Sequence, residues 1–431
     1  MPGLARLAPA QTAPLYFPPL TGPTWATTSP ASLGWCQTPL DSLLAYAGRQ
    51  HTDALLILKD GRLVVEHYYG TYTADSVHYW ASAGKSLTAT LVGLAQQDGL
   101  LRLTDSTSRF LGRGWTNATP AQEGRITIQH QLTMTSGLQD APPAPCDNES
   151  TTPGCLLYLA PPASRWAYHT GAYRTLQDVL VQASGANSIS AYTNQRLGNR
   201  IGMTGLWVND VYFSKARSMA RFGLFILARG TWNGTPILTD TAYFRAMTTP
   251  SQPLNPSYGY LWWLNGQPSY RLPGLQVSFP GPLTPSAPAD MIAALGKNDQ
   301  KIYVVPSLGL VVVRQGASAG APRLALSSFD TELWTRIMAL YCRPTATAAA
   351  LAPASFQAFP NPATDFLTLR QPSGTATVRL LDALGRELRR QPTPTPETTL
   401  SVAALAPGLY TAQWLEASGR LLATRKVART L

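Results

Sequence analysis

The segment that decides the fold runs from Tyr79 to Thr88 and reads Tyr-Trp-Ala-Ser-Ala-Gly-Lys-Ser-Leu-Thr. Its serine and its lysine, Ser82 and Lys85, are three residues apart, so they share one face of any helix that begins here. A serine hydroxyl is a poor nucleophile until a base lies within hydrogen-bond reach, and the Lys85 amine is placed to be that base. Backbone N–H groups at a helix start can also hold a developing oxyanion.

The residues that follow this segment favour a helix. Leucine and alanine recur with helical spacing over residues 86–97, and Asp98-Gly99 ends the pattern. Serine and lysine three apart also occur where ordinary surface helices begin, so the spacing alone leaves both interpretations open. The chain has only six lysines, which strengthens the catalytic interpretation without deciding it.

Two other short patterns point to different chemistry, and neither is complete. Gly84-Lys85-Ser86 is similar to the end of a phosphate-binding loop, but Tyr79 stands where that loop needs its first glycine. Residues 316–320, Gly-Ala-Ser-Ala-Gly, match the nucleophile elbow of α/β-hydrolases, whose histidine follows the serine. No histidine follows His169 in this chain, so we expect a plain loop there.

The composition indicates a folded protein with a large core. The chain has 431 residues, of which 45% are hydrophobic and 13% charged, against about 25% charged in an average soluble protein. These values exclude wholesale disorder, and no apolar run is long enough for a membrane-spanning helix. The net charge is +11, from 34 basic and 23 acidic residues. The arginines are scattered, so we expect a solvated surface and no nucleic-acid partner.

The composition changes once along the chain, at a low-complexity Ala/Thr/Pro stretch over residues 345–354 that is typical of a linker. We therefore predict an N-terminal segment, a main domain, a linker and a C-terminal domain over residues 1–29, 30–343, 344–354 and 355–431. Ala8-Pro9-Ala10 before Gln11 is consistent with the cleavage end of a signal-peptide remnant.

Strand patterns near both ends of the main domain enclose helical patterns. Residues 54–58 and 62–66 flank an Asp-Gly turn, and residues 301–305 and 308–314 form a similar pair, so both predict hairpins. This indicates an α+β domain with one antiparallel sheet covered by helices. In the C-terminal domain, short alternating runs predict a small all-β sandwich; they cover residues 366–369, 376–381, 399–402 and 409–414.

Taken with the segments that follow it, the Tyr79–Thr88 stretch resembles the first motif of the serine β-lactamase and penicillin-binding-protein superfamily, most of all its class C β-lactamase-like branch. That branch also contains esterases and 6-aminohexanoate-dimer hydrolases. The further matches come in the family's order, at residues 126–138, 166–173, 258–263 and 293–296. The resemblance covers about residues 50–340, and it implies a β-lactamase-like α/β (α+β) domain with an antiparallel sheet and a helical subdomain.

The resemblance also implies the catalytic residues. Ser82 would be the nucleophile, Lys85 its proton acceptor, and Tyr168 a second acid/base that serves the leaving group and the deacylating water. A tyrosine acts as a base only if neighbouring cations favour its phenolate, which gives Lys85 a further role. The oxyanion hole would be the backbone N–H of Ser82 and that of Lys297, just past Gly296.

Two positions depart from the family's motifs. Thr170 stands where the second motif has asparagine, and Ala294 stands where the third has the lysine that binds the carboxylate of β-lactams. We therefore expect an ester or amide substrate and do not expect efficient β-lactam hydrolysis. Thr170, His169 and Trp262 are candidate substrate-binding residues, although for His169 and Trp262 a place in the core is equally consistent.

The C-terminal domain resembles the sorting domain of the type IX secretion system. The similarity lies in four short segments, residues 359–365, 381–386, 405–410 and 425–427. The resemblance implies recognition by the outer-membrane secretion machinery and a location outside the cell or on its surface. A carbohydrate-binding or adhesive β domain is the alternative.

The four cysteines have no metal-site spacing, and we predict no metal or cofactor. Cys146 and Cys155 bracket a short polar loop just before the Tyr168 motif, so we predict a disulfide there. In the family that the main domain resembles, the first and last helices pack side by side, which would bring Cys36 and Cys342 together. Four buried free thiols are the alternative.

These observations predict a secreted, monomeric serine hydrolase that forms an acyl-enzyme with a small-molecule or peptide ester or amide. The alternative is a catalytically idle protein of the same fold that binds peptides or peptidoglycan. The presence of Ser82, Lys85 and Tyr168 together argues against that alternative.

Overall fold

The computed structural model describes residues 14–320, 326–341, 356–372, 377–383, 385–393, 395–416 and 421–430. The chain forms two compact units, Met1–Cys342 and Arg343–Leu431. The predicted signal-peptide cleavage site, the linker over residues 344–354 and Cys342 lie outside the described residues.

A six-stranded antiparallel sheet forms the centre of the first unit. Its strand order is β2-β1-β13-β12-β11-β8. The strands are β1 (Thr52–Lys59), β2 (Arg62–Tyr68), β8 (Trp263–Leu264), β11 (Ile292–Gly296), β12 (Gln300–Val305) and β13 (Leu310–Gly316). Both predicted hairpins are confirmed, because β1 pairs with β2 and β12 pairs with β13. The inner strands are almost wholly buried, which explains their continuous apolar runs.

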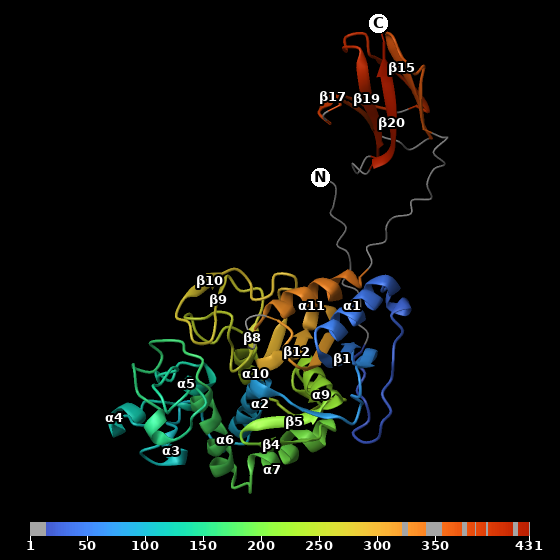
Figure 1. Cartoon of the computed structure of the whole chain (residues 1–431). Coiled ribbons are helices and arrows are strands. Elements are labelled where there is room, and N and C mark those ends of the chain that lie inside the picture. The colour runs from blue at the N-terminus through green and yellow to red at the C-terminus, as the bar shows by residue number, and fades with distance from the viewer. Residues whose placement is uncertain are drawn as a thin grey trace. The chain divides into compact units, whose positions relative to one another are not determined.

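Helices cover both faces of this sheet (Figure 1). On one face lie α1 (Gln37–Arg49) and α11 (Ser328–Ala339), where the ring of Tyr46 stacks on that of Phe329 at 5.9 Å. On the other face lie α2 (Gly84–Gln97) and α9 (Ala216–Leu227). The helix predicted over residues 86–97 is α2, which begins two residues earlier.

A helical subdomain and small strand pairs complete the first unit. Its helices are α3 (Ser108–Leu111), α4 (Pro120–Glu123), α5 (Ile128–Leu132), α6 (Thr170–Ser184), α7 (Ile189–Thr193), α8 (Asn199–Ile201) and α10 (Thr241–Met247). Its strands are β3 (Val77–Tyr79), β4 (Gly205–Val208), β5 (Val211–Lys215), β6 (Thr231–Trp232), β7 (Thr235–Pro236), β9 (Ser269–Arg271) and β10 (Ser278–Pro280). No helix in the described part of the chain has the length and apolar character needed to cross a membrane.

The second unit consists of two antiparallel sheets around one core, as the alternating runs predict. One sheet has the order β14-β15-β18 and the other β17-β16-β19-β20. The strands are β14 (Gln357–Phe359), β15 (Phe366–Arg370), β16 (Thr377–Leu381), β17 (Glu387–Pro392), β18 (Glu397–Ser401), β19 (Gly408–Leu415) and β20 (Leu421–Arg429). Leu367 and Leu369 from the first sheet share the core with Val378 and Trp414 from the second.

Candidate active site

Ser82 lies in a tight turn at the start of α2. The turn is a 3-10 helix, Ala81–Ala83, and it begins with Ala81 at φ 47°, a left-handed conformation that is uncommon for a residue with a side chain. Trp80 fixes the entry to this turn, because its backbone N–H donates to the Tyr212 carbonyl at 2.7 Å and its indole N–H donates to the Ser214 hydroxyl at 2.7 Å. The half-buried Ser82 is thereby held beside the first N–H groups of α2.

The amine of Lys85 lies next to the hydroxyl of Ser82. Its Nζ is 2.9 Å from Ser82 Oγ and 3.2 Å from Thr170 Oγ1. Nζ also lies over two aromatic rings, with the ring centroid of Tyr168 at 4.9 Å and that of Tyr173 at 4.4 Å. Among the described residues no carboxylate forms an ion pair with Lys85. Burial in this site, with a smaller contribution from the positive charge of Arg174, lowers the pKa of Lys85 to about 7.

Tyr168 reaches Ser82 from the segment just before α6. Its hydroxyl forms a side-chain hydrogen bond with Ser82, and its ring stacks on Trp263 with centroids 5.9 Å apart. Burial raises the pKa of Tyr168 above its ordinary value, and the bond to Ser82 offsets only part of that effect. The expectation that Lys85 would favour the phenolate is not met, because burial favours the neutral phenol and Lys85 is not among the groups that lower this pKa. The side chain at Tyr168 is a phenol that can donate a proton.

Two of the predicted substrate-binding residues lie in the core instead. Trp262 has no exposed surface and stacks on Phe222 at 5.9 Å, while the next residue, Trp263, faces Tyr168. His169 is 1% exposed and caps α6, because its Nδ1 accepts a hydrogen bond from the Ala172 backbone N–H at 3.2 Å. Burial lowers the pKa of His169 to about 4, so its ring is neutral. These two predictions are corrected, whereas Thr170 lies directly beside Lys85.

The end of β11 lies against the Ser82 turn, where the oxyanion hole was predicted. A Cβ on Gly296 would meet the Trp80 carbonyl oxygen at 2.3 Å and the Ala83 nitrogen at 3.1 Å, so only glycine permits this approach. The 3-10 turn Lys297–Asp299 follows directly. The Lys297 side chain is exposed, and Ala294 is buried within β11, so no cation occupies the position of the family's third-motif lysine.

The side chain of Arg314 fixes the 3-10 turn Lys297–Asp299 through hydrogen bonds. It is fully buried and donates to the carbonyl oxygens of Asn298 at 3.0 Å and of Asp299 at 3.1 Å. From the other side, the Asn298 amide donates to the Tyr79 hydroxyl at 2.8 Å. The backbone that carries the Lys297 N–H is thus fixed to both β13 and β3.

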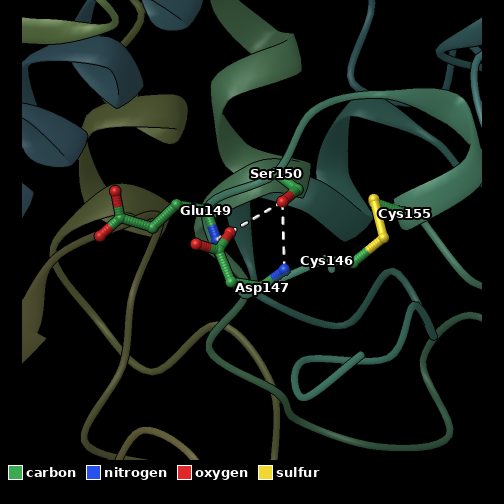
Figure 2. Close-up of a disulfide and its surroundings, with 5 residues drawn as sticks. All are labelled: Cys146, Asp147, Glu149, Ser150 and Cys155. Atoms are coloured by element: carbon green, nitrogen blue, oxygen red, sulfur yellow. Dashed lines mark hydrogen bonds between the residues drawn. A yellow bond between two sulfur atoms is a disulfide. The ribbon is translucent and has the colours of Figure 1, made fainter. Parts of the chain in front are cut away.

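The loop between Cys146 and Cys155 packs against the second motif, and a disulfide joins these two residues as predicted (Figure 2). Sequence reasoning did not identify Asn148 of this loop, whose amide donates to the Tyr168 carbonyl at 2.9 Å and accepts from the Thr170 backbone N–H at 3.0 Å. For the second predicted pair, the Cys36 backbone N–H donates to the Leu340 carbonyl at 3.1 Å. Cys342 itself lies outside the described residues, so that pair stays a prediction.

Other features of the described residues do not add to the site. Ser318 lies in a loop after β13, as expected. No group of three or more His, Cys, Asp or Glu side chains in the described ranges is arranged to hold a metal ion. A cavity of about 910 Å³ is lined by Arg229, Phe244, Tyr260 and Ile292 among others, but Ser82, Lys85 and Tyr168 do not border it.

Comparisons with known proteins agree with the resemblance. Residues 40–314 match the family described as beta-lactamase, and residues 357–427 match the secretion system C-terminal sorting domain. No match was found among curated proteins. The sorting domain indicates that the protein is secreted or located on the cell surface, and it implies an interaction with the secretion machinery.

Solved structures share the fold of the first unit at low identity. A β-lactamase from Mycobacterium bovis is 18% identical with a TM-score of 0.51, covering 70% of this chain and 99% of its own. A penicillin-binding-protein homologue from Caulobacter crescentus is 13% identical with a TM-score of 0.52, covering 71% and 98%. EstCE1, a hydrolase with promiscuous acyltransferase activity, is 14% identical with a TM-score of 0.53, covering 73% and 99%.

Proposed function

The chain belongs to the β-lactamase family, and on that premise we propose that it is a secreted serine hydrolase that cleaves an ester or amide through an acyl-enzyme on Ser82. The observation that carries this proposal is the 2.9 Å separation between Lys85 Nζ and Ser82 Oγ, at a lysine whose pKa is lowered to about 7. A buried amine with that pKa is substantially neutral at physiological pH, which is the state that a general base requires.

Acylation begins when Ser82 Oγ attacks the acyl carbonyl carbon and its proton passes to Lys85 Nζ. The carbonyl oxygen becomes an oxyanion, which the backbone N–H groups of Ser82 and Lys297 stabilise. The tetrahedral intermediate then collapses. The bond to the leaving group breaks as the Tyr168 phenol donates its proton to that group, and the ammonium of Lys85 restores the phenol.

Deacylation repeats these steps with water as the nucleophile. Lys85 accepts a proton from the water, and the oxyanion forms in the same place. Ser82 then leaves as a hydroxyl by taking the proton of the Tyr168 phenol, which the ammonium of Lys85 restores. The raised pKa of Tyr168 suits a group that donates a proton and takes it back within each half-reaction. Thr170, at 3.2 Å from Lys85 Nζ, keeps the amine aimed at Ser82.

The substrate class follows from the groups that border Ser82. With Ala294 in place of a lysine, the third motif supplies no cation for a substrate carboxylate, so uncharged acyl groups fit better than β-lactams. EstCE1, which shares the fold, is a hydrolase with promiscuous acyltransferase activity, so acyl transfer is a chemistry that this fold can support.

Covalent labelling tests the proposal and separates it from the alternative of a binding protein without catalysis. The full chain is treated with a fluorophosphonate, digested and analysed by mass spectrometry, alongside the Ser82→Ala variant. We expect one adduct, on Ser82, and none in the variant. An adduct on Ser318, or ester turnover that survives Ser82→Ala, would contradict the proposal. A panel of esters, amides and D-peptides then identifies the substrate class.

A further inference from the structure

One side chain, Asn148, contacts the backbone on both sides of His169. Its Nδ2 donates to the Tyr168 carbonyl at 2.9 Å and to the Asp140 carbonyl at 2.7 Å, and its Oδ1 accepts from the Thr170 N–H at 3.0 Å. Its own carbonyl accepts from the Gly171 N–H at 2.7 Å. Asn148 thus satisfies the backbone groups of the two residues whose side chains meet the Ser82–Lys85 pair.

The rest of the loop packs closely on the start of α6. A Cβ on Gly171 would lie 2.0 Å from the Ser150 carbonyl oxygen, so a larger residue there would force the loop away. Beyond it, the Arg174 guanidinium donates to the Glu149 carbonyl at 2.8 Å and to the Glu149 carboxylate at 2.9 Å. These contacts fix the loop to one turn of one helix.

The loop is also organised internally (Figure 2). The disulfide between Cys146 and Cys155 closes it. Within the loop, the Ser150 hydroxyl donates to the Asp147 carboxylate at 2.8 Å and accepts from the Asp147 backbone N–H at 3.1 Å. The position of Asn148, between Asp147 and Glu149, is therefore determined before any substrate binds.

We propose that Asn148 is a positioning residue, which holds the backbone of Tyr168 and Thr170 so that their side chains converge on Lys85 and Ser82, and that the disulfide-closed loop preorganises Asn148 for this task. This inference rests on the proposed function. It assigns the loop a role in the rate of acyl transfer, because a small displacement of the proton donor at Tyr168 lowers the rate far more than it lowers substrate binding.

The test is the Asn148→Ala variant, with Thr151→Ala as the matched control in the same loop. Thr151 is exposed, and its side chain makes no hydrogen bond within the described residues. With the ester that wild type hydrolyses best, we expect kcat to fall about 100-fold and KM to change less than about threefold in Asn148→Ala. The control should match wild type. If Asn148→Ala does not fold, Asn148→Asp keeps the shape and the acceptor but loses both donated bonds, and the same direction is expected.

A double-mutant cycle separates positioning from general stabilisation. In the Tyr168→Phe background the proton donor is already absent, so Asn148→Ala should lower kcat less than about tenfold. Equal losses in both backgrounds, or wild-type kcat in a folded Asn148→Ala, would overturn the positioning role. The fluorophosphonate adduct on Ser82 is measured in the same preparations. Its absence in wild type would overturn the proposed function itself. If the adduct is present, a failed kcat prediction counts against the positioning role of Asn148 alone.

Discussion

Lys85 Nζ lies 2.9 Å from Ser82 Oγ, and among the described residues no carboxylate pairs with the amine. An unpaired buried lysine is costly as a cation, so the folded protein favours its neutral form. The burial of Lys85 Nζ therefore affects both the stability of the folded protein and the ability of this amine to act as a base. The burial that lowers the pKa of Lys85 to about 7 is what allows the amine to accept the serine proton.

The pH dependence of the hydrolysis follows from that pKa. Below about pH 7 Lys85 is protonated and cannot act as a base, so kcat/KM should rise with pH and level off above about 7. In Lys85→Ala the rate should fall about 10²- to 10⁴-fold, and the rise near pH 7 should disappear. Initial rates from pH 5 to 9 measure both effects. A flat profile in wild type would contradict the assignment of Lys85 as the base.

Removing the phenol of Tyr168 should affect the rate but leave the fold intact. Tyr168→Phe keeps the ring that stacks on Trp263 and loses only the hydroxyl that bonds to Ser82, so we expect a loss of about 10²-fold or more in acyl transfer. Tyr46→Phe is the control, because Tyr46 is a buried tyrosine on α1, across the sheet from α2. Stopped-flow acylation rates and thermal unfolding distinguish a catalytic loss from a structural one.

The buried His169 should make the free energy of unfolding depend on pH. Its pKa is about 4 in the folded protein, against about 6.5 in an unfolded chain, so between these values only the unfolded state takes up the proton. Stability should therefore fall as pH falls from 6.5 to 4, by about 3 kcal/mol at 1.4 kcal/mol per pH unit.

The variant His169→Asn, which retains an acceptor for the cap of α6, should lose that part of the pH dependence. His51→Asn is the control, since His51 is exposed. Urea unfolding at several pH values measures the effect. An unchanged slope in His169→Asn would show that other groups cause it.

The sequence was informative where local chemistry determines structure. An Asp-Gly turn between two apolar runs was sufficient to predict the β1–β2 hairpin, and the Ser82–Lys85 spacing was sufficient to place both groups on one helical face. The sequence was insufficient to decide which of Trp262 and Trp263 lies near the site. Adjacent residues of an extended segment face opposite ways, so an error of one residue assigns a core residue to the site. Leu261 precedes them at φ 57°, a backbone reversal that no periodicity reveals.

Contacts made by irregular loops also could not be predicted from the sequence. Asn148 reaches Tyr168 across 20 residues of chain, through a segment without helical or strand period. His169 lies within the second motif, but its side chain serves the helix that begins at Thr170. The polar loop between two cysteines was the one available signal for Asn148, and it indicated the loop without identifying the residue.

The disulfides should be detectable by peptide mapping without reduction. We expect Cys146–Cys155 and Cys36–Cys342, and the Cys36 backbone already bonds to Leu340 near the end of the last helix. Replacing Cys146 and Cys155 together by alanine should lower the free energy of unfolding by up to about 3 kcal/mol, the chain-entropy value for so short a loop. Cys36 joined to Cys146 would contradict both pairings.

Substrate preference tests the consequence of Ala294. Because that position is buried and uncharged, the site has no cation at the third motif, and short p-nitrophenyl esters should have a kcat/KM far above that of any cephalosporin. The exposed side chain of Lys297 is a nearby amine in the sequence that could take its place. Lys297→Ala should therefore leave ester hydrolysis within about threefold of wild type, because only its backbone N–H contributes to the oxyanion hole. Efficient cephalosporin hydrolysis that disappears in Lys297→Ala would instead show that Lys297 binds the substrate carboxylate.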